Sequence, residues 1–130
     1  ATEDENYSRM TIEILGDERT IRQIRAQLAK QAEVVKLKEL NETDSVLREL
    51  LLIKISVEKS EIPEIVDLTR IYKAKTVDIA GGAMTLELTG RAAKLDSFIE
   101  ELKPYGIIEM ARSGSSALER GTASLRETEE

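Results

Sequence analysis

The 130-residue sequence contains no cysteine and no histidine. The absence of cysteine excludes disulfide bonds, a thiolate nucleophile and a thiolate metal site. The absence of histidine removes the commonest general acid–base group and transition-metal ligand. Carboxylates, lysine and tyrosine still allow catalysis, but the two absences favour a non-enzymatic protein, in which we expect no catalytic residues and no metal site.

Aromatic residues and positive charge are also scarce. Only 3% of the residues are aromatic, so the core must be built from aliphatic side chains. Lysine and arginine number 19 against 25 aspartates and glutamates, which gives a net charge of −6. Nucleic-acid binding usually needs a basic face, and the sequence indicates none. The longest apolar run, Leu50 to Ile53, has the length of a strand rather than of a membrane span. We therefore expect neither nucleic acid nor a membrane as a partner.

The sequence does contain a regular succession of strand and helix patterns. Alternation of apolar and polar residues is typical of half-buried strands, while apolar residues three and four apart are typical of amphipathic helices. Asp17 can cap the first helix, Pro63 fits the first turn of the second, and Gly81-Gly82 fits a tight hairpin turn. The patterns predict strands at residues 8–15, 34–40, 50–57, 76–79, 84–90 and 107–112, and helices around residues 21–28, 60–72 and 95–102.

One short stretch occurs nearly twice. Residues 10–16 read MTIEILG, and residues 84–90, 74 positions later, read MTLELTG. Residues 48–112 follow the βαββαβ order of a ferredoxin-like domain, and residues 8–40 match its latter half. We therefore predict an α+β fold of tandem ferredoxin-like βαββαβ units, the first of them truncated. The helical stripes agree with the repeat, because Ile21, Ile24 and Leu28 stand at the same offsets as Leu95, Phe98 and Leu102.

The repeat also predicts what the first unit lacks. Its period would place roughly 27 residues of that unit, an opening strand and helix, ahead of Ala1. A strand–helix–strand fragment has an uncovered sheet edge and half a core. We therefore expect residues 1–40 to rely on a second copy, a swapped element or residues outside this chain.

Seven short stretches of the sequence stand out together: SRMTI (8–12), GDE (16–18), RELLLIKI (48–55), VD (77–78), LELTG (86–90), KLD (94–96) and IEMARSG (108–114). They resemble the small regulatory subunit of acetohydroxyacid synthase, also called acetolactate synthase. They keep the order of that family from residue 8 to about residue 121, which is nearly the whole chain. Each stretch is a weak signal alone, but the ordered series is specific, because unrelated ferredoxin-like domains share the order of elements without sharing these residues.

The resemblance implies two domains and a tail. Residues 1–42 would be the latter half of an N-terminal ACT domain, residues 47–113 a C-terminal ACT-like domain, and residues 114–130 a flexible tail. The protein would be non-catalytic. It would bind the catalytic large subunit of acetolactate synthase, raise its activity and confer feedback inhibition by valine or another branched-chain amino acid. Thiamine diphosphate, FAD and Mg²⁺ would belong to that partner and no cofactor to this chain, and a homodimer in the cytoplasm is the expected state.

The effector site of the family does not map onto this chain. In ACT domains the effector contacts a loop after the first strand, at a dimer interface. That loop would lie upstream of Ala1, so the effector-binding residues are unknown. The equivalent loop of the second unit, residues 58–63, has no glycine that would let a ligand carboxylate approach backbone N–H groups. We therefore do not expect this chain to bind valine with normal affinity.

Two strand ends supply candidate contacts with a partner subunit. Arg48 and Glu49 open the main predicted strand, and Arg112, Ser113 and Gly114 close the last one. Arg48 and Glu49 can equally form an exposed ion pair at the strand end. Arg112 can either hold a partner carboxylate with two hydrogen bonds or lie over the sheet edge. The sequence leaves both alternatives open at each position.

Other protein classes share this order of elements. A small ferredoxin-like hydrolase needs an anion-binding cradle with an arginine and an asparagine, but the only asparagines, Asn6 and Asn41, lie in predicted loops. An RNA-binding module needs aromatic residues on its central strands, and residues 50–57 and 84–89 have none. A ferredoxin-like binding module or hydrolase unrelated to branched-chain amino-acid synthesis is the alternative to a regulatory subunit.

Overall fold

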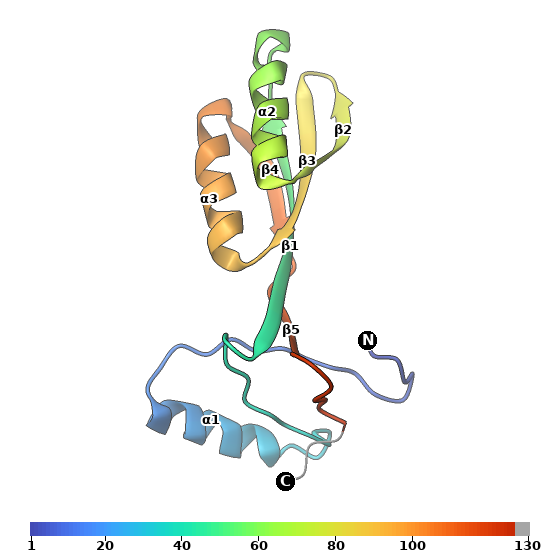
Figure 1. The fold of residues 1–130 in the computed structure, drawn as a ribbon, viewed down its shortest axis with the longest axis vertical. Helices are drawn as coiled ribbons and strands as arrows, with labels where there is room; N and C mark the ends of the chain where they lie inside the picture. Colours follow the sequence, from blue (N-terminus) through green and yellow to red (C-terminus); the bar gives the residue numbers. More distant parts are fainter. Residues whose placement is uncertain (127–130) are drawn as a thin grey trace. The chain divides into compact units, whose positions relative to one another are not determined.

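The computed structural model describes residues 1–126 and divides the chain into two compact units. Unit 1 combines residues Ala1–Val46 with the C-terminal segment that begins at Ser116, and unit 2 comprises Leu47–Ser115. Figure 1 shows unit 2 as a sheet with two helices on one face, and unit 1 with a single helix. No helix among the described residues is long and apolar enough to span a bilayer.

Unit 2 has the predicted βαββαβ order. Strand β1 (Ser45–Ser56), which begins in unit 1, leads to helix α2 (Ile62–Tyr72) and to the hairpin of β2 (Lys75–Ala80) and β3 (Ala83–Gly90). Helix α3 (Ala92–Leu102) and strand β4 (Ile107–Arg112) complete the unit. The sheet has the order β2-β3-β1-β4, with antiparallel neighbours. This arrangement confirms the predicted α+β, ferredoxin-like class.

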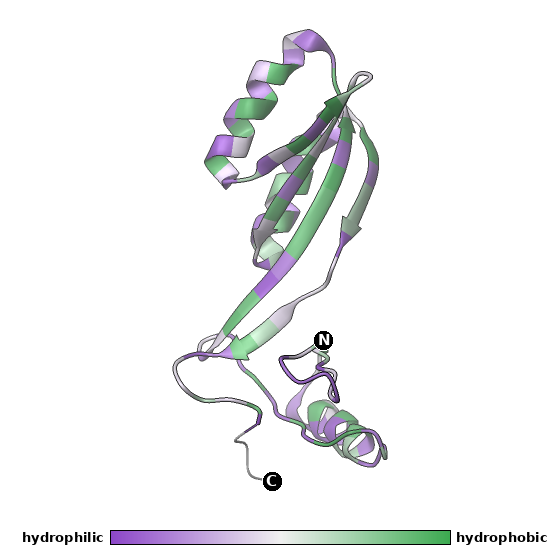
Figure 2. Ribbon diagram, turned by 90° about the vertical axis from the view of Figure 1, so that its right-hand side faces the viewer, coloured by the Kyte–Doolittle hydropathy of each residue, from purple (hydrophilic) through white to green (hydrophobic). Residues whose placement is uncertain are grey.

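The core of unit 2 forms because its central strands alternate in polarity. Leu51, Ile53 and Ile55 of β1 are fully buried, and in the register Ile53 lies opposite the buried Leu86 of β3. Opposed residues in an antiparallel pair point to the same face, so the two strands present one apolar surface to the helices. Figure 2 shows these apolar stretches as green segments along the strands. The helices close the core with Ile65, Leu95, Phe98, Ile99 and Leu102.

Helices α2 and α3 are joined by a tyrosine. The ring centroids of Tyr72 and Phe98 are 5.0 Å apart with an interplanar angle of 52°. The hydroxyl of Tyr72 lies 2.7 Å from that of Ser97 on α3. A tilted aromatic pair and a hydrogen bond therefore fix the C-terminal end of α2 against α3.

Two turn predictions are confirmed. Pro63 lies in the first turn of α2, where its missing N–H has no intrahelical acceptor to lose. Gly81 and Gly82 connect β2 to β3 with φ values of +59° and +78°. Both residues therefore occupy the left-handed region that a two-residue hairpin turn requires.

In unit 1 the predicted helix forms but the predicted strands do not. Helix α1 (Glu18–Ala29) begins after Asp17, whose Oδ1 accepts a hydrogen bond of 2.8 Å from the N–H of Thr20, as predicted for an N-cap. Residues 8–15 and 34–40 have no regular secondary structure, so the strand predictions there are wrong for this chain. Their counterparts in unit 2, β3 and β4, both pair with β1. The described part of unit 1 has no strand that would lie between these two segments as β1 lies between β3 and β4. An extended segment without a neighbouring strand cannot form the hydrogen-bonded ladder of a sheet.

The expectation of a flexible tail at residues 114–130 is wrong in part. Strand β5 (Ser116–Glu119) lies within this range and pairs with β1, because β1 extends past the pairing limits of β3 and β4. Ala117 of β5 is buried, and its carbonyl oxygen accepts a hydrogen bond of 2.8 Å from Nη2 of Arg9. Residues 127–130 lie outside the described residues.

Candidate functional site

The strand ends that the sequence singled out meet at a cluster around Arg112. Its Nη2 lies 3.0 Å from Oε2 of Glu49, and its Nη1 lies 2.6 Å from Oδ1 of Asp96. Arg112 comes from the end of β4, Glu49 from the first half of β1, and Asp96 from the second turn of α3. The guanidinium therefore connects two strands and a helix at one end of unit 2.

Glu49 is the buried member of this cluster. Only 6% of Glu49 is exposed, whereas the preceding residue, Arg48, is exposed. Successive residues on a strand point to opposite faces, so Glu49 points to the helix side with Leu51 while Arg48 points away. The alternative of an exposed ion pair between Arg48 and Glu49 is therefore wrong. Arg48 donates instead to the carbonyl oxygen of Leu47, at 2.7 Å.

Ser113 and Gly114 continue the pairing of β4 with β1. The N–H of Ser113 donates to the carbonyl oxygen of Leu50 at 3.0 Å, and the N–H of Leu50 donates to Oγ of Ser113 at 2.9 Å. The chain then turns at Gly114, which has a φ of +75°. Such a turn favours glycine because a Cβ is strained in that region. Three of the five candidate residues, Glu49, Arg112 and Ser113, are thus brought together, while Arg48 faces elsewhere.

The two carboxylates of the cluster stabilise the charged form of Arg112 and accept hydrogen bonds from its guanidinium. The hydrogen bond that Arg112 donates to Asp96 is the largest cause that raises the pKa of Arg112, burial lowers that pKa, and Glu49 raises it further. Both terminal nitrogens of the guanidinium already have carboxylate partners within the chain. Arg112 would have to give up one of these partners to bind a carboxylate of another subunit, so the cluster works as an internal clamp.

Asp96 was missed by the sequence reasoning as a member of this cluster. It belongs to the KLD stretch, but nothing in the spacing of the sequence connects it with Arg112, 16 residues later. The available signal was the ferredoxin-like order itself. In that order the start of the second helix and the end of the last strand lie at the same end of the domain.

The loop equivalent to the effector loop is closed on itself. The N–H of Glu58 donates to Oε1 of Glu61 at 2.9 Å, and the N–H of Glu61 donates to the carbonyl oxygen of Glu58, also at 2.9 Å. These two N–H groups are therefore already used within the chain. Among residues 1–126, no group of three or more carboxylates is placed to hold a metal ion.

Comparison with known proteins gives the same family over most of the chain. A family model described as the small subunit of acetolactate synthase matches residues 48–121. A probable acetolactate synthase small subunit from Methanothermobacter thermautotrophicus is 38% identical over 125 residues, which are 95% of this chain and 74% of the relative. One from Archaeoglobus fulgidus is 41% identical over 120 residues, which are 92% of this chain and 75% of the relative.

A solved structure supports the relationship at the level of the fold. The crystal structure of an acetolactate synthase small subunit from Thermotoga maritima has a TM-score of 0.75 and 33% sequence identity to this chain. The similarity covers 84% of this chain and 68% of that one. Since both the family model and relatives above 30% identity extend over most of the sequence, this chain belongs to the family of acetolactate synthase small subunits.

Proposed function

We propose that this chain binds the catalytic large subunit of acetolactate synthase, raises its activity and, with a branched-chain amino acid such as valine, confers feedback inhibition. The observation that carries the proposal is the similarity to acetolactate synthase small subunits over 95% of the chain. A small subunit implies a larger catalytic one. The thiamine diphosphate, FAD and Mg²⁺ needed for the reaction are assigned to that partner.

The chemistry of the chain supports a regulatory role. In the polar cluster around Arg112, the guanidinium is paired with two carboxylates of the same chain. With no histidine and no cysteine in the sequence, the usual general base and the usual thiolate nucleophile are also missing. Unit 2 would contact a partner through a surface formed by its helices and strands.

The proposed mechanism is differential binding. A regulator raises the activity of a partner only if it binds the active conformation more tightly than the inactive one, and an effector reverses this only if it changes that difference. We assign the effector response to an ACT domain that contains residues 1–42, and the stable docking platform to the ACT-like residues 47–113. A homodimer would provide the interface at which ACT domains bind their effectors.

Reconstitution tests the proposal. Purified catalytic subunit from the same organism is assayed for acetolactate formation alone, with this chain, and with this chain plus valine. We expect co-elution of the two proteins and a higher rate in the mixture. An unchanged rate together with separate elution would overturn the proposal. An increased rate that valine does not affect would retain activation and remove the effector response from these 130 residues.

A further inference from the structure

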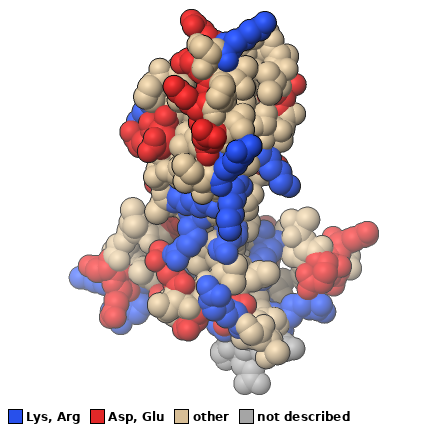
Figure 3. Space-filling view, turned by 45° about the horizontal axis from the view of Figure 1, so that its top comes forward, with Lys and Arg blue, Asp and Glu red and all other residues tan. Residues whose placement is uncertain are grey.

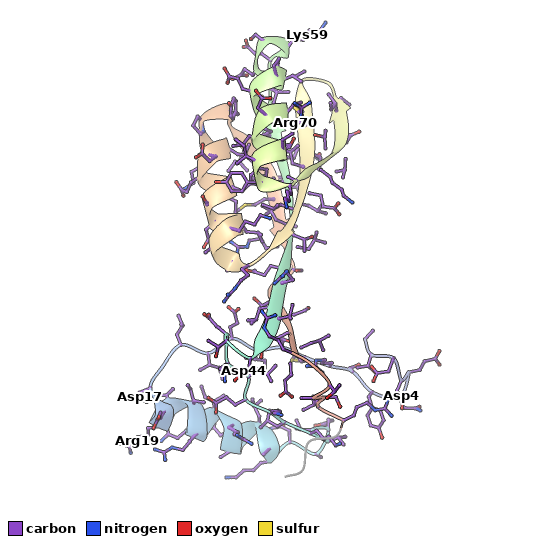
Figure 4. The ribbon with its side chains drawn as sticks, in the orientation of Figure 1. Asp4, Asp17, Arg19, Asp44, Lys59 and Arg70 are labelled. Carbon is purple, nitrogen blue, oxygen red and sulfur yellow. The ribbon has the colours of Figure 1, made fainter. Side chains whose placement is uncertain are left out.

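The charges of unit 2 are separated towards its two ends. Helix α2 runs from the acidic end to the basic end and α3 runs back, so the C-terminus of α2 and the N-terminus of α3 lie together. Figure 4 labels Lys59, which precedes α2, and Arg70, which lies in the last turn of α2, and Figure 3 shows that lysine and arginine side chains gather on part of the visible surface. The basic end carries Arg70, Lys73, Lys75, Arg91 and Lys94 together with Asp96, while the other end carries Glu58, Glu61, Glu64, Glu100 and Glu101 together with Lys59 and Lys103.

Negative charges offset the basic end only in part, and two of them, Glu49 and Asp96, are bound to Arg112. Asp67 lies 4.0 Å from Arg70, but both side chains are more than 70% exposed, so this pair has little energetic weight. Glu87 lies opposite Lys75 in the β2–β3 register. The sequence as a whole has a net charge of −6 and gave no indication of a basic face. The expectation that no basic face exists is therefore wrong for unit 2, because the fold collects cations that are dispersed along the chain.

An exposed apolar side chain lies next to these cations. Ile71 is 75% exposed, and it follows Arg70 directly at the C-terminal end of α2. A large aliphatic side chain beside a charged rim has the composition of a protein-binding surface, in which an apolar contact gives affinity and the rim gives orientation. We call Arg70, Ile71, Lys73, Lys75 and Lys94 the basic-end surface.

The geometry of this surface is held by specific contacts. Tyr72 fixes the end of α2 to α3 through its hydrogen bond with Ser97 and its contact with Phe98. A Cβ added at Gly90 would come within 2.8 Å of Cδ of Lys94, so the missing side chain leaves room for the aliphatic stem of this lysine. The cations of α2 and α3 are therefore presented on one rigid support.

Lys73 occupies an unfavourable backbone conformation for its type. It caps α2 with φ +58° and ψ +39°, and it is the one residue other than glycine with a positive φ among the described residues. This position at the end of a helix usually carries glycine or asparagine. A lysine there accepts local strain and adds a charge to the basic-end surface, which is the pattern expected where a side chain serves binding.

We infer that the basic-end surface is a docking site for an acidic protein surface with an apolar recess for Ile71. The inference rests on the proposed function, since the catalytic large subunit is the partner that it supplies. A protein is favoured over nucleic acid because the exposed apolar residue of the surface, Ile71, is aliphatic, while the neighbouring ring of Tyr72 packs on Phe98 and is not free for base stacking, and because the chain as a whole is acidic. Opposite charge on the two proteins would accelerate association and fix the orientation of the complex.

Charge reversal with a matched control tests the inference. The test variant combines Arg70→Glu, Lys73→Glu and Lys75→Glu. The control combines Lys54→Glu, Lys59→Glu and Lys103→Glu, which changes the net charge equally but lies outside the basic-end surface. Binding of each full chain to the catalytic subunit is measured by calorimetry at low and high salt, after circular dichroism has shown that each variant is folded. We expect the test variant to lose roughly 30-fold or more in affinity and most of its salt dependence, and the control to stay within about threefold of the wild type.

Two single variants keep the test decisive if the triple variant does not fold. Ile71→Ser removes the apolar contact and is expected to weaken binding about tenfold. Lys73→Gly relieves the backbone strain, so it is expected to stabilise unit 2 while it weakens binding. Equal affinities for the test variant, the control and the wild type would overturn the inference and leave the proposed function intact. No binding by the wild type would overturn the proposed function. Salt-sensitive binding to a single-stranded oligonucleotide, lost in the test variant, would assign the surface to nucleic acid and also overturn the inference.

Discussion

The charged residues of this chain differ sharply in how much their ion pairs contribute to the stability of the fold. Arg112 connects a buried carboxylate and an exposed one, while other ion pairs, such as Lys54 with Glu109 at 3.8 Å, join exposed side chains. An exposed pair contributes little, because water and salt already screen its charges. A buried carboxylate that loses its partner is a large penalty, because its charge is then neither hydrated nor paired.

Replacement of Arg112 tests this difference. We expect Arg112→Ala to lower the free energy of unfolding by about 3 kcal/mol, because it leaves Glu49 buried and unpaired. Asp96→Asn, which alters the exposed partner of the same guanidinium, should cost less than about 1 kcal/mol. Urea titrations followed by circular dichroism measure both values. Similar losses of stability in the two variants would show that the burial of Glu49 does not cause the effect of Arg112→Ala.

Tyr105 makes the stability of the fold depend on pH in the alkaline range. Its hydroxyl donates to Oε2 of Glu64 at 2.8 Å, and this hydrogen bond is the main cause that raises the pKa of Tyr105 above its usual value near 10. A raised pKa in the folded state means that the contribution to stability is complete below the unfolded pKa and is lost as the pH rises through the folded one.

We therefore expect Tyr105→Phe to flatten the fall in stability above about pH 10. Urea midpoints measured between pH 8 and pH 11 check this, with Tyr7→Phe in unit 1 as the control. An alkaline limb that is as steep in Tyr105→Phe as in the wild type would contradict the assignment.

At the scale of elements, the ends of helices are the informative positions. Asp17 accepts from the N–H of Thr20 and begins α1, and this hydrogen bond lowers the pKa of Asp17. Helix α2 ends instead at a left-handed lysine, where glycine would be the usual residue. The N-cap of α1 follows the general residue preference and was predicted from the sequence. The C-cap of α2 departs from the preference, because Lys73 stands where glycine is usual.

The stability effect of this departure is measurable. We expect Lys73→Gly to raise the free energy of unfolding by about 1 kcal/mol, since it removes the steric cost of a Cβ at positive φ. Lys73→Ala, which retains a Cβ and removes the charge, should leave stability nearly unchanged. Chemical denaturation of the three proteins in parallel separates the two effects. A loss of stability in Lys73→Gly would show that the lysine side chain makes contacts that outweigh the strain.

At the scale of the whole molecule, the two units differ in how much apolar surface they bury. In the described residues every buried apolar side chain except Ala117 belongs to unit 2. Helix α1 has no buried residue, and Met10 and Leu15 of unit 1 are 83% and 100% exposed. Burial of apolar surface is the main favourable term in folding, so unit 1 contributes little to the stability of the chain.

Hydrogen exchange should reveal this difference. Amides of β1 and β3 are expected to exchange only through global unfolding, whereas those of α1 exchange through local opening at much lower free energy. A fragment of residues 45–115, which retains the whole of β1, should fold cooperatively without the rest of the chain. Equal protection of α1 and β1 would contradict this prediction. Addition of a partner that pairs with residues 8–15 or 34–40 should increase the protection of α1.

The sequence by itself determined most of unit 2. The alternation through Leu51, Ile53 and Ile55, the Gly81-Gly82 turn and the stripe of α3 are local patterns, and each has one favourable structural outcome. The ordered stretches also predicted the family, which the comparisons confirmed. The same patterns failed at residues 8–15 and 34–40, because alternation makes a segment competent to form a strand but does not provide the neighbour to which it must pair.

Only the tertiary structure decided how distant charges meet. Nothing in the sequence relates Glu49 to Arg112 and Asp96, or collects Arg70, Lys75 and Lys94 at one end of a domain in a chain that is acidic overall. The spacing of charged residues along the sequence does not predict where they lie in the fold, because a charged side chain can be hydrated almost anywhere on the surface. Apolar side chains must leave water together, so their spacing records the fold, whereas the positions of the charges follow from it.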